Sequence, residues 1–185
     1  MNGSQASFQP SLRFMRVKGN RIMTDIMHST VLTSARPKPG SQVETEVLNR
    51  RDIFEKTQAA EIAVLTPADP GGLSHDLRHA LAARIAALHG EPDQAARYAA
   101  GVTDAALSPL ASVGTTSADA QVQAMLTFTD AVSTNPREIV AEDVTALQSA
   151  GVSDADIVRL AELNAFLAYQ LRLIAGLRLL VEAAE

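Results

Sequence analysis

Apolar residues recur every three to four positions through most of the chain after residue 45, which is the spacing of one face of an α-helix. After Ser74, for example, Leu77, Leu81, Ile85 and Leu88 follow this interval, and alanines fill many of the positions between them. No alternation of strand and helix patterns is present, so we expect an all-α fold. Breaks rich in proline, glycine or small polar residues separate the predicted helices, which cover residues 46–65, 74–88, 92–99, 118–132, 142–150 and 153–181.

The last predicted helix, over 153–181, is apolar on almost every side. Ser153 is its expected N-cap, and Asp156 occupies the capping-box position three residues later. A helix that is apolar all round must be buried on several sides, and a domain of about 140 residues could hardly bury it completely. We therefore expect this long helix to be buried at the centre of a homo-oligomer.

The first 45 residues differ from the rest of the chain in their charge. They carry a net charge of +4, whereas the remaining residues carry −9. The stretch Arg36-Pro-Lys-Pro-Gly40 is incompatible with a helix and is typical of a linker. We expect a disordered basic leader and linker over 1–45, with Met23 as an alternative start, and a single helical domain over 46–185.

Composition agrees with a helical fold and excludes several kinds of chemistry. Alanine, the best helix former, supplies 32 of the 185 residues. The chain contains no cysteine, which excludes thiolate nucleophiles, disulfide bonds and cysteine-ligated metal sites.

Charge and hydropathy narrow the expected partners and location. An acidic domain argues against a nucleic-acid partner, because such partners require a basic surface. No window reaches the run of about 18 apolar residues that a membrane span needs. Asp25 and His28 interrupt the one stretch that resembles a secretory signal. We expect a cytoplasmic protein with neither a membrane nor a nucleic-acid partner.

Two histidines have the spacing of metal ligands on a helix. His75 and His79 lie four residues apart, as in His-Glu-x-x-His, with Asp76 in place of the glutamate. A zinc site needs a third protein ligand, and His89 lies beyond the end of the same helix. We therefore expect no metal and no other cofactor.

Two segments resemble the AhpD-like family, which includes alkylhydroperoxidases and carboxymuconolactone decarboxylases. The first, over 73–90, is similar to the family's capped, alanine-rich helix. The second, over 124–177, is similar to the C-terminal half of peroxidase-related members, with a helix that ends in Asn-Pro, a short acidic helix that ends in Gly, the cap Gly-Val-Ser-Asp-Ala-Asp-Ile and the pattern Arg-Leu-x-x-Gly-Leu. The resemblance implies an AhpD-like helical bundle, assembled as a trimer or hexamer.

The redox residues of that family are missing. Peroxidatic members carry Cys-x-x-Cys after the glycine, a histidine four residues later and a glutamate twelve residues earlier. The corresponding positions here hold Glu91, Gln94, Tyr98 and His79. Reduction of peroxides through a disulfide is chemically impossible at such a site, so the resemblance points to the cysteine-less, uncharacterised branch of the family.

The same positions suggest a different chemistry. His79, Glu91 and Tyr98 are candidate catalytic residues for an acid–base step of the lyase or isomerase type. Gln94, Arg84 and Arg172 are candidates to bind a small carboxylated or aromatic ligand.

A structural interpretation of these residues remains open. Glu91 and Gln94 also suit the start of a helix, and Tyr98 suits a packed core. Arg172, expected to be buried, could pair with Glu162 or Glu142. In that alternative the protein is a non-enzymatic structural or interaction oligomer with a vestigial pocket.

Overall fold

Serine side chains begin four of the helices in this computed structural model, which describes residues 15–17, 20–22 and 26–184. The hydroxyl oxygens of Ser29, Ser41, Ser74 and Ser153 each accept a hydrogen bond from the backbone N–H three residues later. Such caps satisfy amide groups that the helix itself leaves without partners. The helix starts expected at Ser74 and Ser153 are therefore confirmed. They could be predicted because each cap depends only on neighbouring residues.

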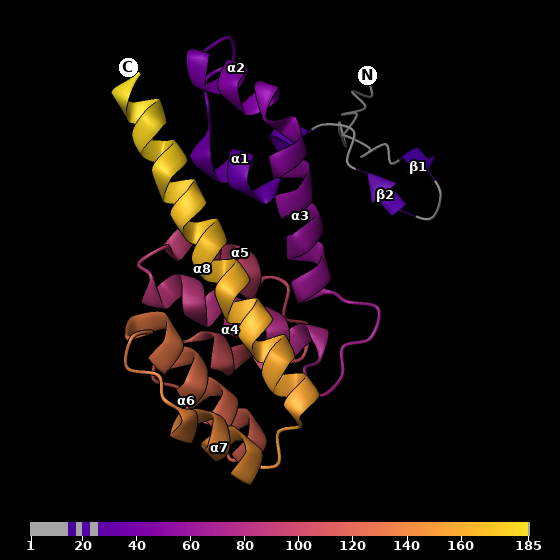
Figure 1. Ribbon diagram of the computed structural model, residues 1–185, viewed down its shortest axis with the longest axis vertical. Helices are drawn as coiled ribbons and strands as arrows, with labels where there is room; N and C mark the ends of the chain where they lie inside the picture. The colour runs from indigo at the N-terminus through magenta and orange to yellow at the C-terminus, as the bar shows by residue number, and fades with distance from the viewer. Residues whose placement is uncertain (1–14, 18–19, 23–25, 185) are drawn as a thin grey trace, which may run out of the picture.

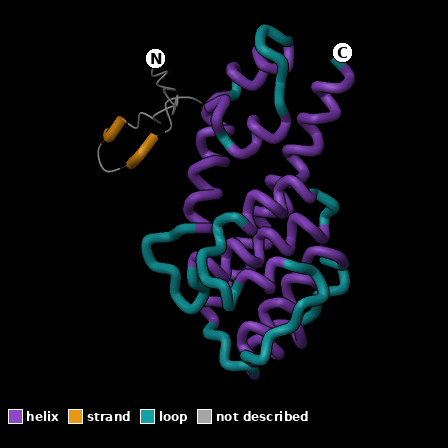
Figure 2. The backbone as a smooth tube through the Cα atoms, turned by 180° about the vertical axis from the view of Figure 1, so that it is seen from behind, coloured by secondary structure: helices purple, strands orange, loops and turns teal. Residues whose placement is uncertain are grey.

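The described residues are all-α apart from one short hairpin, as expected (Figures 1 and 2). Strands β1 (Met15–Val17) and β2 (Asn20–Ile22) pair antiparallel. Two 3₁₀ helices cover η1 (Ile26–His28) and η2 (Ser108–Ala111). The α-helices are α1 (Thr30–Ala35), α2 (Gln42–Asn49), α3 (Arg51–Leu65), α4 (His75–Leu88), α5 (Pro92–Ala99), α6 (Ala120–Thr134), α7 (Ala141–Ser149) and α8 (Asp154–Ala183).

The helix predicted over 46–65 is in fact two helices. They meet at Arg50, whose backbone (φ −115°, ψ 28°) ends α2 and begins α3 without a side-chain cap. Neither proline nor glycine marks this break, so the sequence pattern could not show it.

Ordered structure begins well before residue 46, within the segment predicted to be a disordered leader and linker. Residues Ile26 to Ala35 form η1 and α1, and Ile26, Val31 and Leu32 are almost completely buried. The disordered leader predicted over 1–45 is therefore wrong for residues 26–35 and 42–45, which form η1, α1 and the start of α2, whereas residues 36–41 lie in the turn between α1 and α2. Most of residues 1–25, with the alternative start at Met23, lie outside the described residues.

Two apolar clusters form the core. The larger one is centred on α4 and packs it against α6 and the first half of α8, with Leu81, Leu126 and Leu163 at most 1% exposed. The smaller one joins α1, α2 and α3 to the second half of α8 through residues such as Leu32, Phe54 and Ile174. Helix α8 therefore crosses both clusters, and it spans the molecule from the α6–α7 end to the α2 end (Figure 1).

Within one chain α8 is buried on one side only. Its outward side leaves four large apolar side chains exposed, Val158, Tyr169, Leu179 and Leu180. The burial on several sides that its sequence suggests is thus not found within a single chain. By length and composition alone α8 could also cross a membrane, a test that core helices of soluble proteins pass as well.

Candidate functional site

Three of the predicted site residues lie on or beside α5. Pro92 is the first residue of this helix, where its missing N–H has no consequence. Glu91 precedes it as the N-cap, and Gln94 and Tyr98 lie four residues apart on one face of the helix. Gln94 and Tyr98 are 3% and 2% exposed, so this face of α5 is directed into the protein.

Tyr98 belongs to a buried polar cluster with Glu61 of α3 and Gln170 of α8. The Tyr98 hydroxyl donates to Gln170 Oε1 and lies 3.4 Å from Glu61 Oε1. Gln170 Nε2 donates to Glu61 Oε2 at 3.1 Å. Burial, followed by the charge of Glu61, raises the pKa of Tyr98. Tyr98 is therefore a neutral hydrogen-bond donor in this cluster, and not a base.

Hydrogen bonds extend this cluster towards α1. Gln58 Nε2 donates to Glu61 Oε2 at 2.9 Å, and Gln58 Oε1 accepts from the backbone N–H of Thr30 at 2.8 Å. The Ser34 hydroxyl in turn donates to the carbonyl oxygen of Thr30 at 2.6 Å. We call this line of contacts, from Tyr98 through Glu61 and Gln58 to Thr30 and Ser34, the polar seam.

Gln94 is bound at the Ser34 end of the polar seam and has an unused acceptor. Its Nε2 donates to Ser34 Oγ at 2.7 Å, while its Oε1 is buried without a partner. Because the Ser34 hydroxyl already donates to Thr30, exchanging the amide nitrogen and oxygen of Gln94 would not restore the missing bond. A buried amide oxygen without a donor is costly, so Gln94 marks a place where a bound donor would be stabilised.

His79 lies beside the opposite end of the polar seam. Its ring is half-buried against Gly101, and its Nδ1 is buried without a hydrogen-bond partner that meets the usual geometry. Burial lowers the pKa of His79, although the nearby carboxylates of Asp76 and Glu61 oppose this effect. His79 is therefore neutral near pH 7.

Glu91 opens onto a polar cleft rather than the buried cluster. Glu91 Oε2 accepts a hydrogen bond from Arg178 Nη1 at 2.6 Å, and Arg178 Nε donates to the Ser34 carbonyl oxygen. The cleft, of about 370 Å³, lies where α1, α5 and α8 meet, and its lining includes Arg36 as a second cationic side chain and Asp93 as a second carboxylate. The polar seam therefore begins directly behind the wall of this cleft, at Ser34.

Arg36 reaches the cleft from an unusual backbone conformation. Its φ of 54° is the one positive value that a non-glycine residue adopts within the described part of the chain. The left-handed conformation ends α1, with the Arg36 N–H bonded to the carbonyl oxygen of Leu32. Such strain in a non-glycine residue concentrates at functional sites.

A second, apolar cleft lies between α2 and the end of α8. Its volume is about 470 Å³, and Val47, Phe54 and Leu177 form much of its wall, with Glu46 and Arg50 among its polar residues. None of the candidate catalytic or ligand-binding residues predicted from the sequence lines this apolar cleft.

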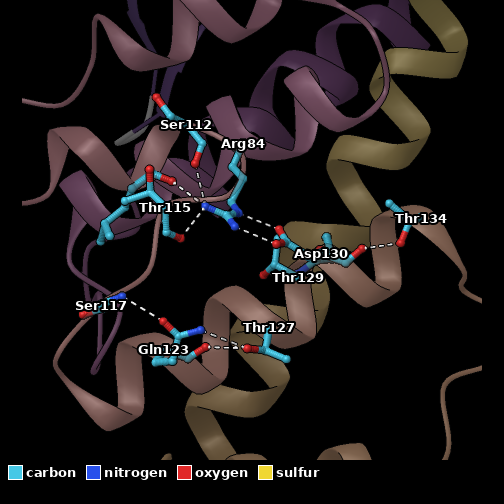
Figure 3. A network of polar contacts seen from close by, with 11 residues as sticks. Arg84, Ser112, Thr115, Ser117, Gln123, Thr127, Thr129, Asp130 and Thr134 are labelled. Atoms are coloured by element: carbon cyan, nitrogen blue, oxygen red, sulfur yellow. Dashed lines mark hydrogen bonds and ion pairs between the residues drawn. The ribbon is translucent and has the colours of Figure 1, made fainter.

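Arg84 is committed to internal contacts (Figure 3). Its Nε and Nη2 donate to the two carboxylate oxygens of Asp130 at 2.5 and 2.6 Å. Its Nη1 lies within hydrogen-bond distance of the carbonyl oxygens of Leu110, Ser112 and Thr115. The Arg84 side chain is 3% exposed and ties α4 to α6 and to the loop around η2, so its role is internal and it does not bind a ligand.

Arg172 is exposed on the outward side of α8, which corrects the expectation that it is buried. No ion pair with Glu162 or Glu142 is formed within the described part of the chain. The arginines that are buried are Arg78 and Arg84. The strongly apolar sequence around Arg172 suggested burial, but the helix turns this position away from the core.

His75 and His79 do not converge on a metal. His75 Nε2 lies 2.9 Å from the carbonyl oxygen of Pro67, at the exposed start of α4. No group of three or more potential ligands from His, Cys, Asp and Glu is found among the residues that the structure describes.

Sequence reasoning missed the partners that organise the site. Glu61 and Gln170 are not among the site residues predicted from the sequence, and Arg36 falls in the predicted linker. A signal was present, because Glu61 and Gln170 interrupt apolar faces of their helices. A buried polar residue needs a partner, but the sequence does not say which one.

The chain was compared with protein families, curated proteins and solved structures. No family model, curated protein or solved structure matches it. The polar cleft and the polar seam are therefore the features from which a function is inferred.

Proposed function

We propose that the protein is a cytoplasmic, cysteine-free AhpD-like protein that binds a small carboxylated compound in the polar cleft. The arrangement of Arg36 and Arg178 around this cleft supports the proposal, because guanidinium groups bind carboxylates through paired, charge-assisted hydrogen bonds. Gln94 and Glu91 occupy the positions that redox cysteines hold in the family that the chain resembles.

Glu91 is the group we propose for acid–base chemistry in the cleft. Its 2.6 Å hydrogen bond from Arg178 Nη1 orients the carboxylate in the cleft. In an isomerisation, Glu91 would take a proton from the carbon next to the ligand carboxylate and return it to another carbon. The sum of atoms and charge in the ligand is then unchanged. Tyr98 lies away from this cleft and supports the polar seam through its hydrogen bond to Gln170, and His79 lies beside the seam.

Thermal unfolding in the presence of carboxylates tests the binding. We expect benzoate or a short dicarboxylate, at about 100 times its dissociation constant, to raise the Tm by about 5–10 °C. Benzamide, which lacks the charge, should have no such effect. Arg36→Gln and Arg178→Gln should remove the shift.

Arg50→Gln is the matched control, since Arg50 lines the apolar cleft instead. If only Arg50→Gln removed the shift, the ligand would bind in the apolar cleft and the proposal would be wrong. For the chemistry, with the short dicarboxylate as ligand, Glu91→Gln should retain the Tm shift but stop exchange of the hydrogens next to the ligand carboxylates with deuterium from solvent.

A second candidate function is a non-enzymatic assembly protein with a vestigial pocket. The exposed apolar side chains Val158, Tyr169, Leu179 and Leu180 of α8 favour it, because exposed apolar groups that gather on one surface often mark an interface. Failure of every carboxylate to bind, together with a stable oligomer, would favour this second function.

A further inference from the structure

The outward side of α8 has the spacing of a coiled-coil seam. Eight exposed positions follow one another at alternating intervals of three and four residues, which is the heptad pattern of helices that wrap around a partner. Figure 1 shows α8 crossing the face of the molecule with no other described helix in front of it. The eight residues of this outer seam are Ala155, Val158, Glu162, Ala165, Tyr169, Arg172, Gly176 and Leu179.

The outer seam is complementary to itself when it is reversed. A two-fold axis placed level with Leu167 brings each position of the outer seam opposite a position of the second copy. The two opposed positions lie equally far from residue 167, one before it and one after it in the sequence. Glu162 then faces Arg172 of a second copy, and Arg172 faces the second copy's Glu162. Large residues meet small ones in the same way, with Tyr169 opposite Ala165 and Val158 opposite Gly176.

We propose that α8 pairs antiparallel with α8 of a second copy of this chain through the outer seam. Opposite charges at Glu162 and Arg172 specify this orientation. A parallel pair would instead bring Glu162 against Glu162 and Arg172 against Arg172, and like charges across an interface disfavour association. The two-fold arrangement also gives each chain the same contact surface, as closed dimers require.

The same side chains argue against a lipid occupant. The outer seam extends over about 36 Å of helix, and both charged residues lie in its middle part, where a bilayer would place hydrocarbon. Arg172 has no ion pair among the described residues, and the pairing supplies one. Alanines at 161, 168 and 175 border the outer seam and allow the two backbones to approach closely.

Charge exchange tests the pairing in the intact chain. By sedimentation velocity, we expect the wild type to form an even-numbered assembly of 19.6 kDa chains. Glu162→Arg and Arg172→Glu should each raise the dissociation constant of the pair by about 100-fold or more. The double variant E162R/R172E should restore it. Arg137→Glu, the same change at another exposed position, should have no effect.

Crosslinking tests the orientation, because the chain contains no cysteine of its own. Val158 and Gly176 of one chain are about 27 Å apart along α8, too far for a disulfide, but they are opposed across the proposed pair. The double variant V158C/G176C should therefore form a covalent dimer on oxidation, whereas V158C and G176C alone should not. A Cβ at Gly176 meets nothing within 4 Å in the monomer, so the substitution is tolerated.

Several results would overturn the pairing. A monomeric or trimeric wild type, a double charge variant that stays dissociated, or crosslinking by V158C alone would each do so. Flotation of the wild type with vesicles of phosphatidylcholine and phosphatidylglycerol would show instead that lipid covers the outer seam. The pairing is independent of the carboxylate site, since Arg172→Glu should leave the Tm shift with ligand intact.

Discussion

Arg84 and Asp130 form a two-point ion pair that joins α4 to α6 across 46 residues of sequence. Arg84 is almost fully buried, whereas Asp130 is one-third exposed. We expect Asp130→Asn to lower the free energy of unfolding by about 3 kcal/mol or more, because it leaves the charge of Arg84 buried without a counter-ion. Urea unfolding measures this change.

Asp52→Asn is the matched control for that experiment. Asp52 pairs with Lys56 on the surface of α3, where both side chains are more than two-thirds exposed. Its loss should cost less than about 1 kcal/mol. Equal effects of the two variants would contradict the structural role of Arg84.

The two tyrosines of the chain should respond differently to loss of their hydroxyl groups. Tyr98→Phe removes the donor to Gln170 within the buried cluster and should cost about 1–3 kcal/mol of stability. Tyr169→Phe should cost less stability than Tyr98→Phe. The Tyr169 hydroxyl is hydrogen-bonded to Thr57, but Tyr169 is 44% exposed, so water can take the place of its hydroxyl in the variant. Denaturant unfolding of both variants compares them, and a smaller effect at Tyr98 would show that the cluster adds no stability.

Stability should decrease as the pH falls below about 6.5. Burial lowers the pKa of His79, and burial followed by the charge of Arg172 lowers the pKa of His89. In the unfolded chain both return to the ordinary value of 6.5. Between the native and unfolded pKa values of these histidines, the unfolded state binds more protons than the native state. The free energy of unfolding therefore rises with pH in this range, and the stability that the two neutral histidines contribute is lost on acidification.

Urea unfolding between pH 7.5 and 5.5 checks the contribution of His79. The variant His79→Gln should show a weaker pH dependence than the wild type, because one of the two histidines no longer titrates. Parallel curves for the two proteins would mean that the surroundings of His79 do not favour its neutral form.

Gly101 is required by its contact with the His79 ring. A Cβ at this position would lie well inside van der Waals distance of His79 Nδ1. We expect Gly101→Ala to cost about 1–3 kcal/mol by overpacking. The cost should shrink in the background His79→Ala, and a double-mutant cycle by thermal unfolding measures this coupling. If the free-energy changes of the two substitutions were additive, the contact between Gly101 and the His79 ring would have no energetic effect.

Local signals made much of the fold predictable. Ser74 and Ser153 begin helices, Pro92 is the first residue of one, and Gly151 has the left-handed backbone expected after another. Each of these features depends on contacts among a few neighbouring residues, so it can be predicted from the sequence around it.

Contacts between distant residues could not be predicted in this way. Residues 26–35 are ordered by contacts with α3 and α8, whereas their composition alone predicts a disordered leader. Glu61 meets Gln170 only because α3 and α8 pack together. Arg172 shows the converse, because an apolar sequence says that a helix is buried but not which of its sides is exposed. The outer seam became visible only once the buried positions of α8 were known.

The division of the core into two clusters has a consequence for motion. Helix α1 and its surroundings contribute only a small set of apolar side chains, which α8 joins to the larger cluster around α4. Regions with few buried contacts open without global unfolding. Amide hydrogens of α1 should therefore exchange with solvent through a partial opening in which the end of α8 detaches. Amide hydrogens of α4 should exchange only through global unfolding of the protein.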